Sequence, residues 1–369
     1  MMPSISEAQE KERRVHLLLS RLGYDALVIT RRDNFAWLTC GGRAVVAYTS
    51  HLSPVYLVLT PTRKYAVGLT MDLPRTMDDE LGGLGYEPVC LPTFGKTPEQ
   101  VTLELAGARA AADDPLLGLP EINPAIRKLH EPYTPQEMER YATACRESGE
   151  ILRRLADWVE PGMTERQVFA HMWYLYLQRG FEGCCMFVGS DERIRRYRHA
   201  VPSDKPIERA VLLAPCASRW GLHVPNSRLV YFTEPPDDIR KRFHAVATMQ
   251  AAIVSRIRPG VKLRALLDLC LNLFETLGYP EERHNHYHGG PTGYQPSYPE
   301  RCQDPEEVVQ PNMAFAWYCT IAGVKNEEVA LVDEHGATIK TIDPTWPTLA
   351  ITYEGTTVAV ADILVRRGR

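Results

Sequence analysis

Apolar positions in the first part of the chain follow helical spacing once and strand-like runs several times. Residues 8–30 carry an amphipathic helical pattern that ends in a short apolar run, Ala26–Thr30. Two further apolar runs, Val55–Thr60 and Tyr65–Leu69, alternate with turn-like stretches. This alternation of helical and strand patterns predicts an α/β domain.

A loop-rich stretch and a marked helix start separate this region from the rest. Residues 92–132 are rich in proline, alanine and loop residues, so we expect two domains, 1–130 and 131–369. At the start of the second domain, Thr134 and Glu137 have the spacing of a capping box, which predicts a helix from Pro135 onward.

The predicted helix carries one apolar stripe, which indicates a buried face. The stripe recurs at spacings of three, four and seven, at Met138, Tyr141, Cys145, Leu152, Leu155 and Val159. The helix ends at Pro161–Gly162, and Thr164 with Gln167 forms a second capping box. A second helix is therefore predicted up to about Arg179.

The same order of elements returns later in the chain. A helix over about Asp238–Ile257 ends at Pro259–Gly260, and another helix follows through Phe274. Strand-like segments follow each helix pair, at Ala210–Leu213, Arg228–Phe232, Met313–Thr320 and Val329–Val332. This order predicts a duplicated helix-helix-strand unit whose two sheets meet at a pseudo-twofold axis. The simpler alternative is that Pro-Gly only ends two unrelated helices.

Composition narrows the class of protein. The chain has 369 residues, 44% of them apolar and 24% charged, as expected of a soluble globular protein with two domains. A net charge of −4 argues against a nucleic-acid partner. No window approaches the roughly 20 apolar residues of a membrane span, and the charged N-terminus does not resemble a secretory signal. Nine cysteines without a CxxC pair indicate reduced thiols and a cytoplasmic protein.

Several short segments resemble the pita-bread family that includes creatinase, prolidase, aminopeptidase P and methionine aminopeptidase. In chain order they are Asn34–Thr39, Pro161–Glu165, Tyr197–Pro202, Arg258–Gly260 and Gly323–Glu328. The resemblance implies an α/β (α+β) architecture, with an N-terminal creatinase-like domain and a C-terminal pita-bread domain of duplicated α-α-β-β units. It also implies a homodimer in which the N-terminal domain of one subunit covers the site of the other.

Metal-dependent members of that family hold two divalent ions with two Asp, one His and two Glu. The matching positions here are Ala214, Pro225, Gly290, Tyr318 and Glu327. Only Glu327 keeps a ligand side chain, and one carboxylate is too little to neutralise and coordinate two cations. We therefore expect no dinuclear metal site and no metal cofactor.

The remaining chemistry centres on histidines. His199 matches the proton-transferring histidine of creatinase, a family member that works without metal, and imidazole titrates near neutrality. If residues 283–290 form a strand, His284, His286 and His288 lie on one face at steps of about 7 Å. These imidazoles would bind a substrate carboxylate or phosphate, transfer protons, or hold a single transition metal together with Glu327. A solvated or hydrogen-bonded histidine cluster is the structural alternative.

Two further groups of side chains are candidates for substrate binding. Glu327 and Glu328 form a carboxylate pair able to split into acid and base, or one of them bonds an arginine or a backbone amide. Tyr318, in a ligand position, would offer its hydroxyl to substrate. Arginine and histidine side chains on the segment without Asp would bind an anionic group, or simply be solvated. They are Arg219, His223 and Arg228.

These observations favour a metal-independent, creatinase-like enzyme that hydrolyses or eliminates at a C–N bond of a small polar molecule. In this hypothesis His199 is base and acid, His286 and His288 polarise the substrate, and Glu327 orients it. One alternative is a metal-dependent Xaa-Pro aminopeptidase or dipeptidase with a rebuilt histidine site. The other is a binding module that has lost catalysis.

Overall fold

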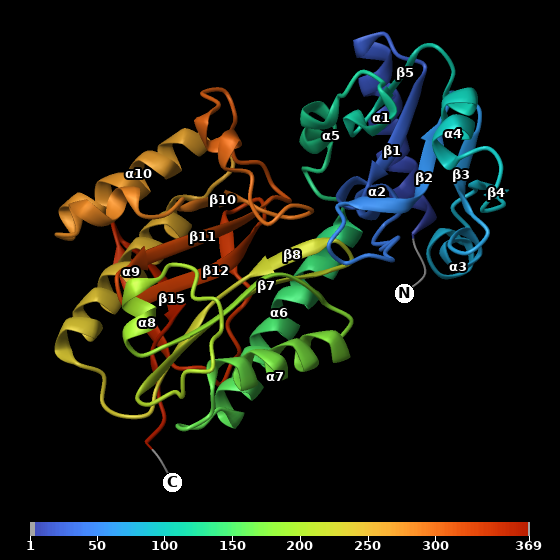
Figure 1. The fold of residues 1–369 in the computed structure, drawn as a ribbon. Coiled ribbons are helices and arrows are strands. Elements are labelled where there is room, and N and C mark those ends of the chain that lie inside the picture. The colour runs from blue at the N-terminus through green and yellow to red at the C-terminus, as the bar shows by residue number, and fades with distance from the viewer. Residues whose placement is uncertain (1–3, 368–369) are drawn as a thin grey trace. The chain divides into compact units, whose positions relative to one another are not determined.

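The computed structural model of the protein describes residues 4–367 (Figure 1). These residues form two compact units, one up to Glu137 and one from Met138 onward. None of the helices in the described part of the chain is long and apolar enough to cross a membrane. All nine cysteines lie within the described residues, and none of them forms a disulfide.

The first unit is an α/β domain, as the hydrophobic pattern predicts. Its five strands lie in the order β4-β3-β2-β1-β5, with β1 parallel to β5 and β3 parallel to β4. Its helices and strands are α1 (Ile5–Leu22), β1 (Ala26–Arg31), α2 (Arg32–Leu38), β2 (Leu52–Leu59), β3 (Lys64–Leu69), α3 (Leu73–Thr76), β4 (Glu87–Leu91), α4 (Pro98–Ala106), β5 (Ala110–Ala112) and α5 (Asn123–Leu129). A π-helical turn spans Met77–Leu81 and a 3-10 turn spans Pro115–Leu117.

The second unit begins with two helices and an antiparallel sheet. Its elements are α6 (Pro135–Trp158), α7 (Glu165–Gln178), β6 (Glu182–Ser190), α8 (Glu192–Arg196), β7 (Ala210–Arg219), β8 (Leu222–Pro225) and β9 (Arg228–Tyr231). Both predicted capping boxes form. The Thr134 amide donates to the Glu137 carboxylate at 2.8 Å, and the Thr164 amide donates to the Gln167 side chain at 2.8 Å. Strand β6 was missed, because its run of Gly and Cys is not a typical strand pattern.

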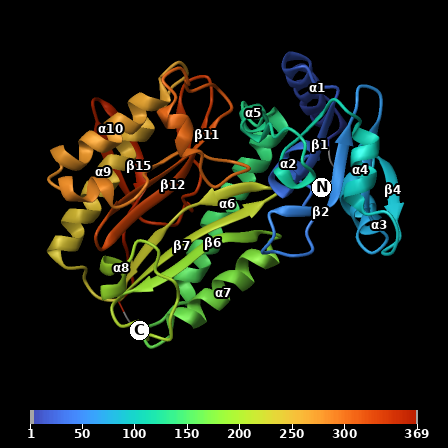
Figure 2. The ribbon, with the colours of Figure 1, turned by 45° about the horizontal axis from the view of Figure 1, so that its top comes forward.

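The same arrangement repeats in the second half of this unit, which confirms the predicted duplication. The elements are α9 (Asp237–Arg256), α10 (Leu263–Thr276), β10 (Gly289–Pro291), β11 (Ala314–Ile321), β12 (Val324–Val332) and β13 (Ala337–Ile339), with 3-10 turns at Pro280–His284 and Pro299–Gln303. The sheet order is β10-β11-β12-β13. Figures 1 and 2 both show α9 and α10 along one face of this sheet.

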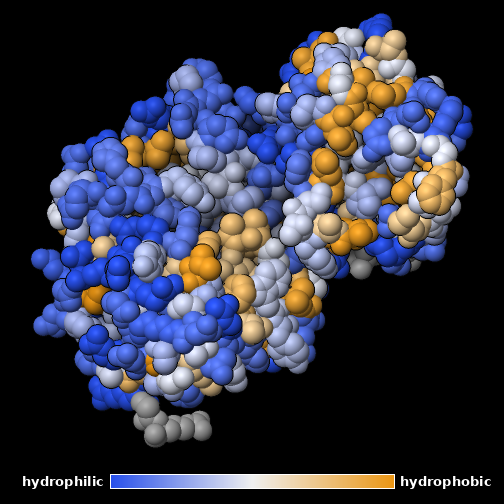
Figure 3. Space-filling view, viewed as in Figure 1, coloured by the Kyte–Doolittle hydropathy of each residue, from blue (hydrophilic) through white to orange (hydrophobic). Residues whose placement is uncertain are grey.

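The main core lies between those helices and the sheet. Phe315 and Trp317 of β11 pack there with Phe243 of α9 and Phe274 of α10, and all four are buried. Because side chains alternate along a strand, the neighbours of Phe315 and Trp317 face the other side of the sheet. On the face drawn in Figure 3, hydrophilic residues predominate over the second unit, with apolar residues scattered among them.

A last segment ties the two halves of the second unit together. Strands β14 (Thr348–Tyr353) and β15 (Thr356–Ala361) form a hairpin, and β16 (Leu364–Val365) pairs in parallel with β9. Beyond β16, the Arg366 guanidinium donates to the carbonyl oxygens of Ala156, at 2.6 Å, and Val159. These acceptors are unpaired carbonyls at the C-terminal end of α6, so a distant residue caps that helix.

Candidate functional site

The candidate site lies on the β10-β11-β12-β13 sheet, on the face that points away from α9 and α10. Three positions that the family resemblance assigns to metal ligands share this face. Gly290 pairs with Ala316 in the register of β10 and β11, and Tyr318 pairs directly with Glu327 in the register of β11 and β12. The strand alternation that buries Trp317 under the helices therefore places Tyr318 and Glu327 together on the opposite side.

A buried ion pair occupies the centre of this face. The Lys325 Nζ lies 2.7 Å from the Glu327 carboxylate, and each side chain is only 7% exposed. Lys325 is two residues before Glu327 on β12, so both point to the same side. Burial raises the pKa of Glu327, and the charge of Lys325 offsets only part of that rise. The one remaining ligand-type carboxylate thus already has a cation beside it.

Tyr318 contacts the same pair. Its ring centroid lies 5.7 Å from the Lys325 Nζ, and its hydroxyl donates a 2.8 Å hydrogen bond to the carbonyl oxygen of Pro296. Burial raises the pKa of Tyr318 far above its usual value, and neighbouring Cys216 and Glu327 raise it further. Tyr318 is therefore a neutral phenol, and its hydroxyl hydrogen is already donated to the Pro296 carbonyl oxygen. A ligand could bond only to the lone pairs of its oxygen.

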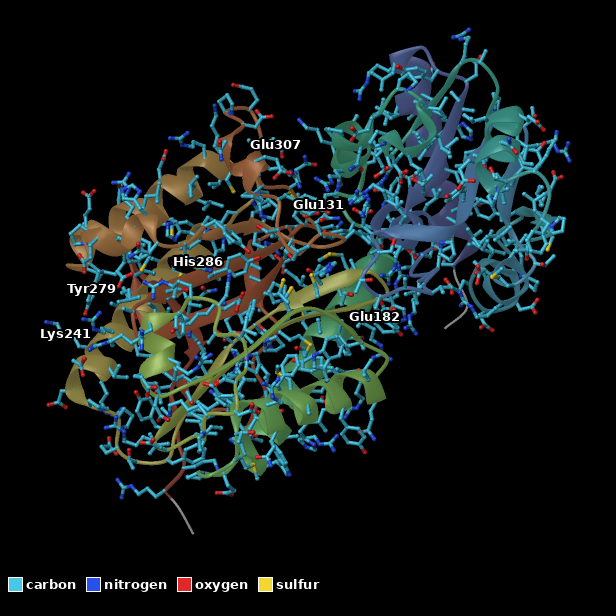
Figure 4. The ribbon with its side chains drawn as sticks, viewed as in Figure 1. Glu131, Glu182, Lys241, Tyr279, His286 and Glu307 are labelled. Atoms are coloured by element: carbon cyan, nitrogen blue, oxygen red, sulfur yellow. The ribbon has the colours of Figure 1, made fainter. Side chains whose placement is uncertain are left out.

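Two of the predicted histidines meet above this pair. The rings of His199 and His286 pack edge to face with centroids 5.3 Å apart, and the His199 ring also stacks on Phe187 at 4.7 Å. His286 packs on Tyr318 at 6.0 Å; its loop follows α10 and lies beside the sheet that contains β11 and β12 (Figure 4). The structure thus brings together four of the predicted residues, His199, His286, Tyr318 and Glu327.

Both histidines are neutral at physiological pH. Burial and then the charge of Lys325 lower the pKa of His286 to about 3, and the same two causes lower the pKa of His199. The Nδ1 atom of His286 bonds the carbonyl oxygen of Tyr287, so this nitrogen carries the proton. Its Nε2 is buried without a hydrogen-bond partner. In this tautomer Nε2 is an acceptor, so His286 accepts a hydrogen bond and does not polarise a carbonyl as we expected.

The predicted one-faced strand of histidines does not form. His284 ends a 3-10 turn and is exposed, and strand β10 begins only at Gly289. His288 is buried; its Nε2 donates to the Arg283 carbonyl oxygen at 2.7 Å, and its ring packs on Phe274 of α10 at 4.9 Å. Its N–H is thus committed to the backbone, which removes it as a substrate polariser. Residue pairing of β10 with β11 begins at Gly289, and among the histidines only the His288 carbonyl oxygen is reached, by the Tyr318 N–H at 2.9 Å.

The second predicted carboxylate is part of an internal ion pair. Arg228 donates to both oxygens of Glu328, at 2.9 and 3.2 Å, and both side chains are about fully buried. The Thr341 hydroxyl donates to the same carboxylate, and Arg228 also donates to the Thr341 carbonyl oxygen at 2.7 Å. Glu328 lies on the opposite side of β12 from Glu327. Of the two alternatives for Glu328, the structure therefore shows the one in which it bonds an arginine.

The remaining two candidates also have partners within the protein. Arg219 forms an ion pair with Glu147, and its guanidinium lies 4.1 Å from the centroid of the Trp220 ring. His223 holds the loop after β10, because its backbone N–H and its Nδ1 both bond the Gly293 carbonyl oxygen at 2.8 Å. We therefore leave Arg219 and His223 out of the site.

Sequence reasoning missed Lys325 and Tyr287. Lys325 lies in the segment 323–328, and its spacing of two from Glu327 on a strand places both side chains on one face. Tyr287 is 52% exposed and packs edge to face on Tyr318 at 5.5 Å. Burial and then the nearby Glu327 raise its pKa. No pattern in the sequence distinguishes Tyr287 from other loop tyrosines.

Known protein families and proteins are similar to this chain over much of its length. The profile of Metallopeptidase family M24 matches residues 139–342. Two Xaa-Pro dipeptidases are 25% identical over 228 residues (Pyrococcus furiosus) and 23% identical over 227 residues (Pyrococcus horikoshii), each match covering 59% of this chain. The chain covers less than two thirds of those proteins, 65% and 64% of their lengths.

Solved structures agree on the fold of both parts. The dipeptidase PepE from Mycobacterium ulcerans has a TM-score of 0.77 at 21% identity, covering 99% of both chains. The prolidase from Pyrococcus horikoshii has a TM-score of 0.75 at 19% identity, covering 90% of this chain and 98% of that one. The N-terminal domain of the FACT subunit SPT16 from chickpea reaches 0.67 at 11% identity, covering 92% and 97%. These likenesses confirm the α/β and pita-bread architecture.

The residues at the expected metal positions do not fit a metal. Within residues 4–367, no group of three or more His, Cys, Asp or Glu side chains is arranged to hold an ion. Gly290, in the place of the metal histidine, has φ +146°, and a Cβ there would meet the Cys302 Sγ at 2.8 Å. A side chain at this position therefore requires Cys302 to move. The rebuilt site of His284, His286 and His288 does not form either, because those three side chains point to different surroundings.

Proposed function

The chain belongs to metallopeptidase family M24, and we propose that it hydrolyses a C–N bond in a small polar substrate without a divalent metal. The observation that carries this proposal is the buried pair of Lys325 and Glu327 at 2.7 Å. The Lys325 ammonium lies beside Glu327, the last ligand-type carboxylate. It supplies a fixed positive charge at the position where a metallopeptidase would hold a metal cation. Lys325 has three N–H donors, and Glu327 uses one of them.

The proton chemistry in this proposal belongs to His199. Its lowered pKa keeps the imidazole neutral near pH 7, which is the form that accepts a proton. His199 takes a proton from water as the water oxygen attacks the carbonyl-type carbon. It then returns that proton to the leaving nitrogen as the C–N bond breaks. The Nε2 atom of His286 accepts a hydrogen bond from the attacking water, and Lys325 stabilises the negative charge that develops on the substrate oxygen.

The names of the relatives suggest where to begin with substrates. Both curated relatives are Xaa-Pro dipeptidases, so Xaa-Pro dipeptides are the first compounds to test. Small amides and guanidino compounds with a carboxylate form the second group, in line with the creatinase-like segments of the sequence. A metal-dependent dipeptidase remains the competing function, and these relatives favour it, but it needs ligands that the four substituted positions lack.

The experiment combines metal content with hydrolysis. Protein purified without tags or chelators is analysed by plasma mass spectrometry, and the two substrate groups are assayed with and without EDTA. We expect far less than one equivalent of any transition metal and a rate that EDTA leaves unchanged. His199→Gln lowers that rate at least 100-fold, whereas the control His284→Gln, at an exposed position, leaves it unchanged.

Each of the other outcomes would indicate a different function or mechanism. Two equivalents of metal and a rate abolished by EDTA would restore the metallopeptidase mechanism and overturn the proposal. One equivalent, lost in His286→Ala, would indicate a mononuclear site. Binding of a substrate without turnover, unchanged in His199→Gln, would identify a binding module.

A further inference from the structure

Glu282 is a buried carboxylate outside the site that contacts all three segments carrying the site residues. It lies in the 3-10 turn Pro280–His284 after α10, and it is 4% exposed. Neither the sequence motifs nor the proposed chemistry uses it. Burial of a carboxylate costs free energy unless its oxygens accept hydrogen bonds. The hydrogen-bond partners of Glu282 therefore indicate its role.

The first tie runs to the segment of His199. The guanidinium of Arg198, the residue before His199, donates to the Oε2 atom of Glu282 in an ion pair. The Arg198 side chain is itself only 19% exposed. Because this guanidinium is held on one carboxylate oxygen, the backbone that carries His199 is held too.

The second and third ties run to the other two segments. The Asn285 amide donates to the same Oε2 atom at 3.1 Å, and Asn285 is the residue before His286. The backbone N–H of Ala322 donates to the Oε1 atom at 2.9 Å. Ala322 lies in the turn between β11 and β12, three residues before Lys325. One carboxylate therefore touches the direct neighbours of both imidazoles and the start of the strand that carries the ion pair.

These bonds keep Glu282 ionised. Burial alone would raise its pKa, but the Ala322 N–H, Asn285 and Arg198 outweigh that effect and hold its pKa below its usual value. A charged acceptor makes each of these hydrogen bonds stronger than a neutral one would. The two loops also meet directly at a ring contact, His199 on His286 at 5.3 Å.

We propose that Glu282 is a positioning residue, which fixes the distance between His199, His286 and Lys325 by tying their three segments to one carboxylate. This inference rests on the proposed function for its catalytic consequence, but not for its structural one. Displacement of a reacting group by about 1 Å costs up to about 100-fold in rate. Loss of the Glu282 hydrogen bonds is therefore expected to separate the two imidazoles and to lower the rate of the reaction.

The test is histidine-selective ¹⁵N labelling of the full chain, with imidazole shifts read by long-range ¹H–¹⁵N correlation. Glu282→Gln keeps the shape and removes the charge, and we expect it to shift the imidazole signals of both His199 and His286. Glu281→Gln removes the same charge from the exposed neighbouring residue and leaves both signals in place. Asn285→Ala cuts one tie at an exposed position, so it shifts the His286 signal more than the His199 signal.

Activity provides a separate readout. With a substrate identified, Glu282→Gln lowers kcat at least ten-fold while KM changes less than three-fold, and Glu281→Gln changes neither. If the wild-type chain hydrolyses nothing, the proposed function fails but the imidazole shifts still decide the role of Glu282. Unchanged His199 and His286 signals in folded Glu282→Gln, or equal shifts in Glu281→Gln, would overturn the inference. Should Glu282→Gln not fold, unchanged His286 signals in Asn285→Ala overturn it.

Discussion

Lys325 and Glu327 point to the same side of β12, with the ammonium nitrogen 2.7 Å from the carboxylate and both side chains nearly excluded from solvent. Glu327 is also the direct cross-strand partner of Tyr318. Desolvation of two charges offsets most of their attraction in such a pair, whereas removal of one partner leaves the other charge buried alone. The pair is therefore sensitive to single substitutions and tolerant of paired ones.

Lys325→Met is expected to destabilise the second unit by about 3–5 kcal/mol at pH 7. The double variant Lys325→Met/Glu327→Leu is expected to recover most of this loss, because no charge is left uncompensated. Guanidinium unfolding followed by fluorescence measures both free energies. A loss below about 1 kcal/mol in the single variant would mean that solvent reaches the pair, contrary to its burial.

Arg228→Met is expected to cost a similar amount, about 3–5 kcal/mol, because it leaves the buried Glu328 carboxylate without its guanidinium. The matched control is Arg264→Met. Arg264 pairs with Asp268 at 2.9 Å on the surface of α10, with both side chains about half exposed. Exposed pairs of this kind contribute about 0.3–0.5 kcal/mol. Equal losses for the two variants would contradict the structural role of Arg228.

Stability is expected to fall in acid, in part because of His286. Its pKa is about 3 in the folded protein, and that of an unfolded histidine is about 6.5. Between these values the unfolded chain binds more protons, so the free energy of unfolding decreases as the pH falls from about 6.5 toward 3.

His286→Gln removes this contribution. Over pH 4 to 6, the slope of unfolding free energy against pH is expected to decrease by about one proton, or about 1.4 kcal/mol per pH unit. Urea titrations at several pH values measure the slope. His284→Gln, at the exposed position, serves as the control. A slope that is the same in the wild type and in His286→Gln would show that His286 is protonated in the folded protein.

Gly290→Ala is expected to destabilise more than Gly278→Ala, by about 1–3 kcal/mol. Both glycines have positive φ, +146° and +85°, so both substitutions carry backbone strain. Only at Gly290 does the new Cβ meet another atom, the Cys302 Sγ, whereas nothing lies within 4 Å at Gly278. Thermal unfolding of the two variants compares them, and equal Tm values would show that Cys302 moves aside freely.

Local signals in the sequence predicted local structure well. The capping boxes at Thr134 and Thr164 predicted two helix starts correctly, because a cap is formed by residues three apart. The repeated order of helices and strands predicted the duplicated unit, and the family resemblance added the pita-bread fold, which the solved structures confirm. The prediction that four metal positions lack ligand side chains depends only on residue identity and on the family resemblance.

Contacts between distant segments were not predictable. Arg228 and Glu328 are 100 residues apart, and no spacing rule connects them. The alternating histidines predict a strand over residues 283–290, but the 3-10 turn Pro280–His284 takes up the start of that segment, and Glu282 in this turn bonds Arg198 and Ala322 from distant parts of the chain. Lys325 is the exception, because simple strand alternation places it on the same face as Glu327.

The pairing of β16 with β9 has a consequence for synthesis of the protein. Val230 of β9 pairs with Leu364, and Arg366 reaches back to the end of α6, more than 200 residues earlier. While a ribosome is still making the second repeat, the sheet of the first repeat therefore has an open edge at β9, and α6 lacks its cap. Such an edge is a template for wrong strand pairing. Until residue 366 leaves the exit tunnel, the nascent chain therefore keeps an edge at β9 that is open to wrong pairing.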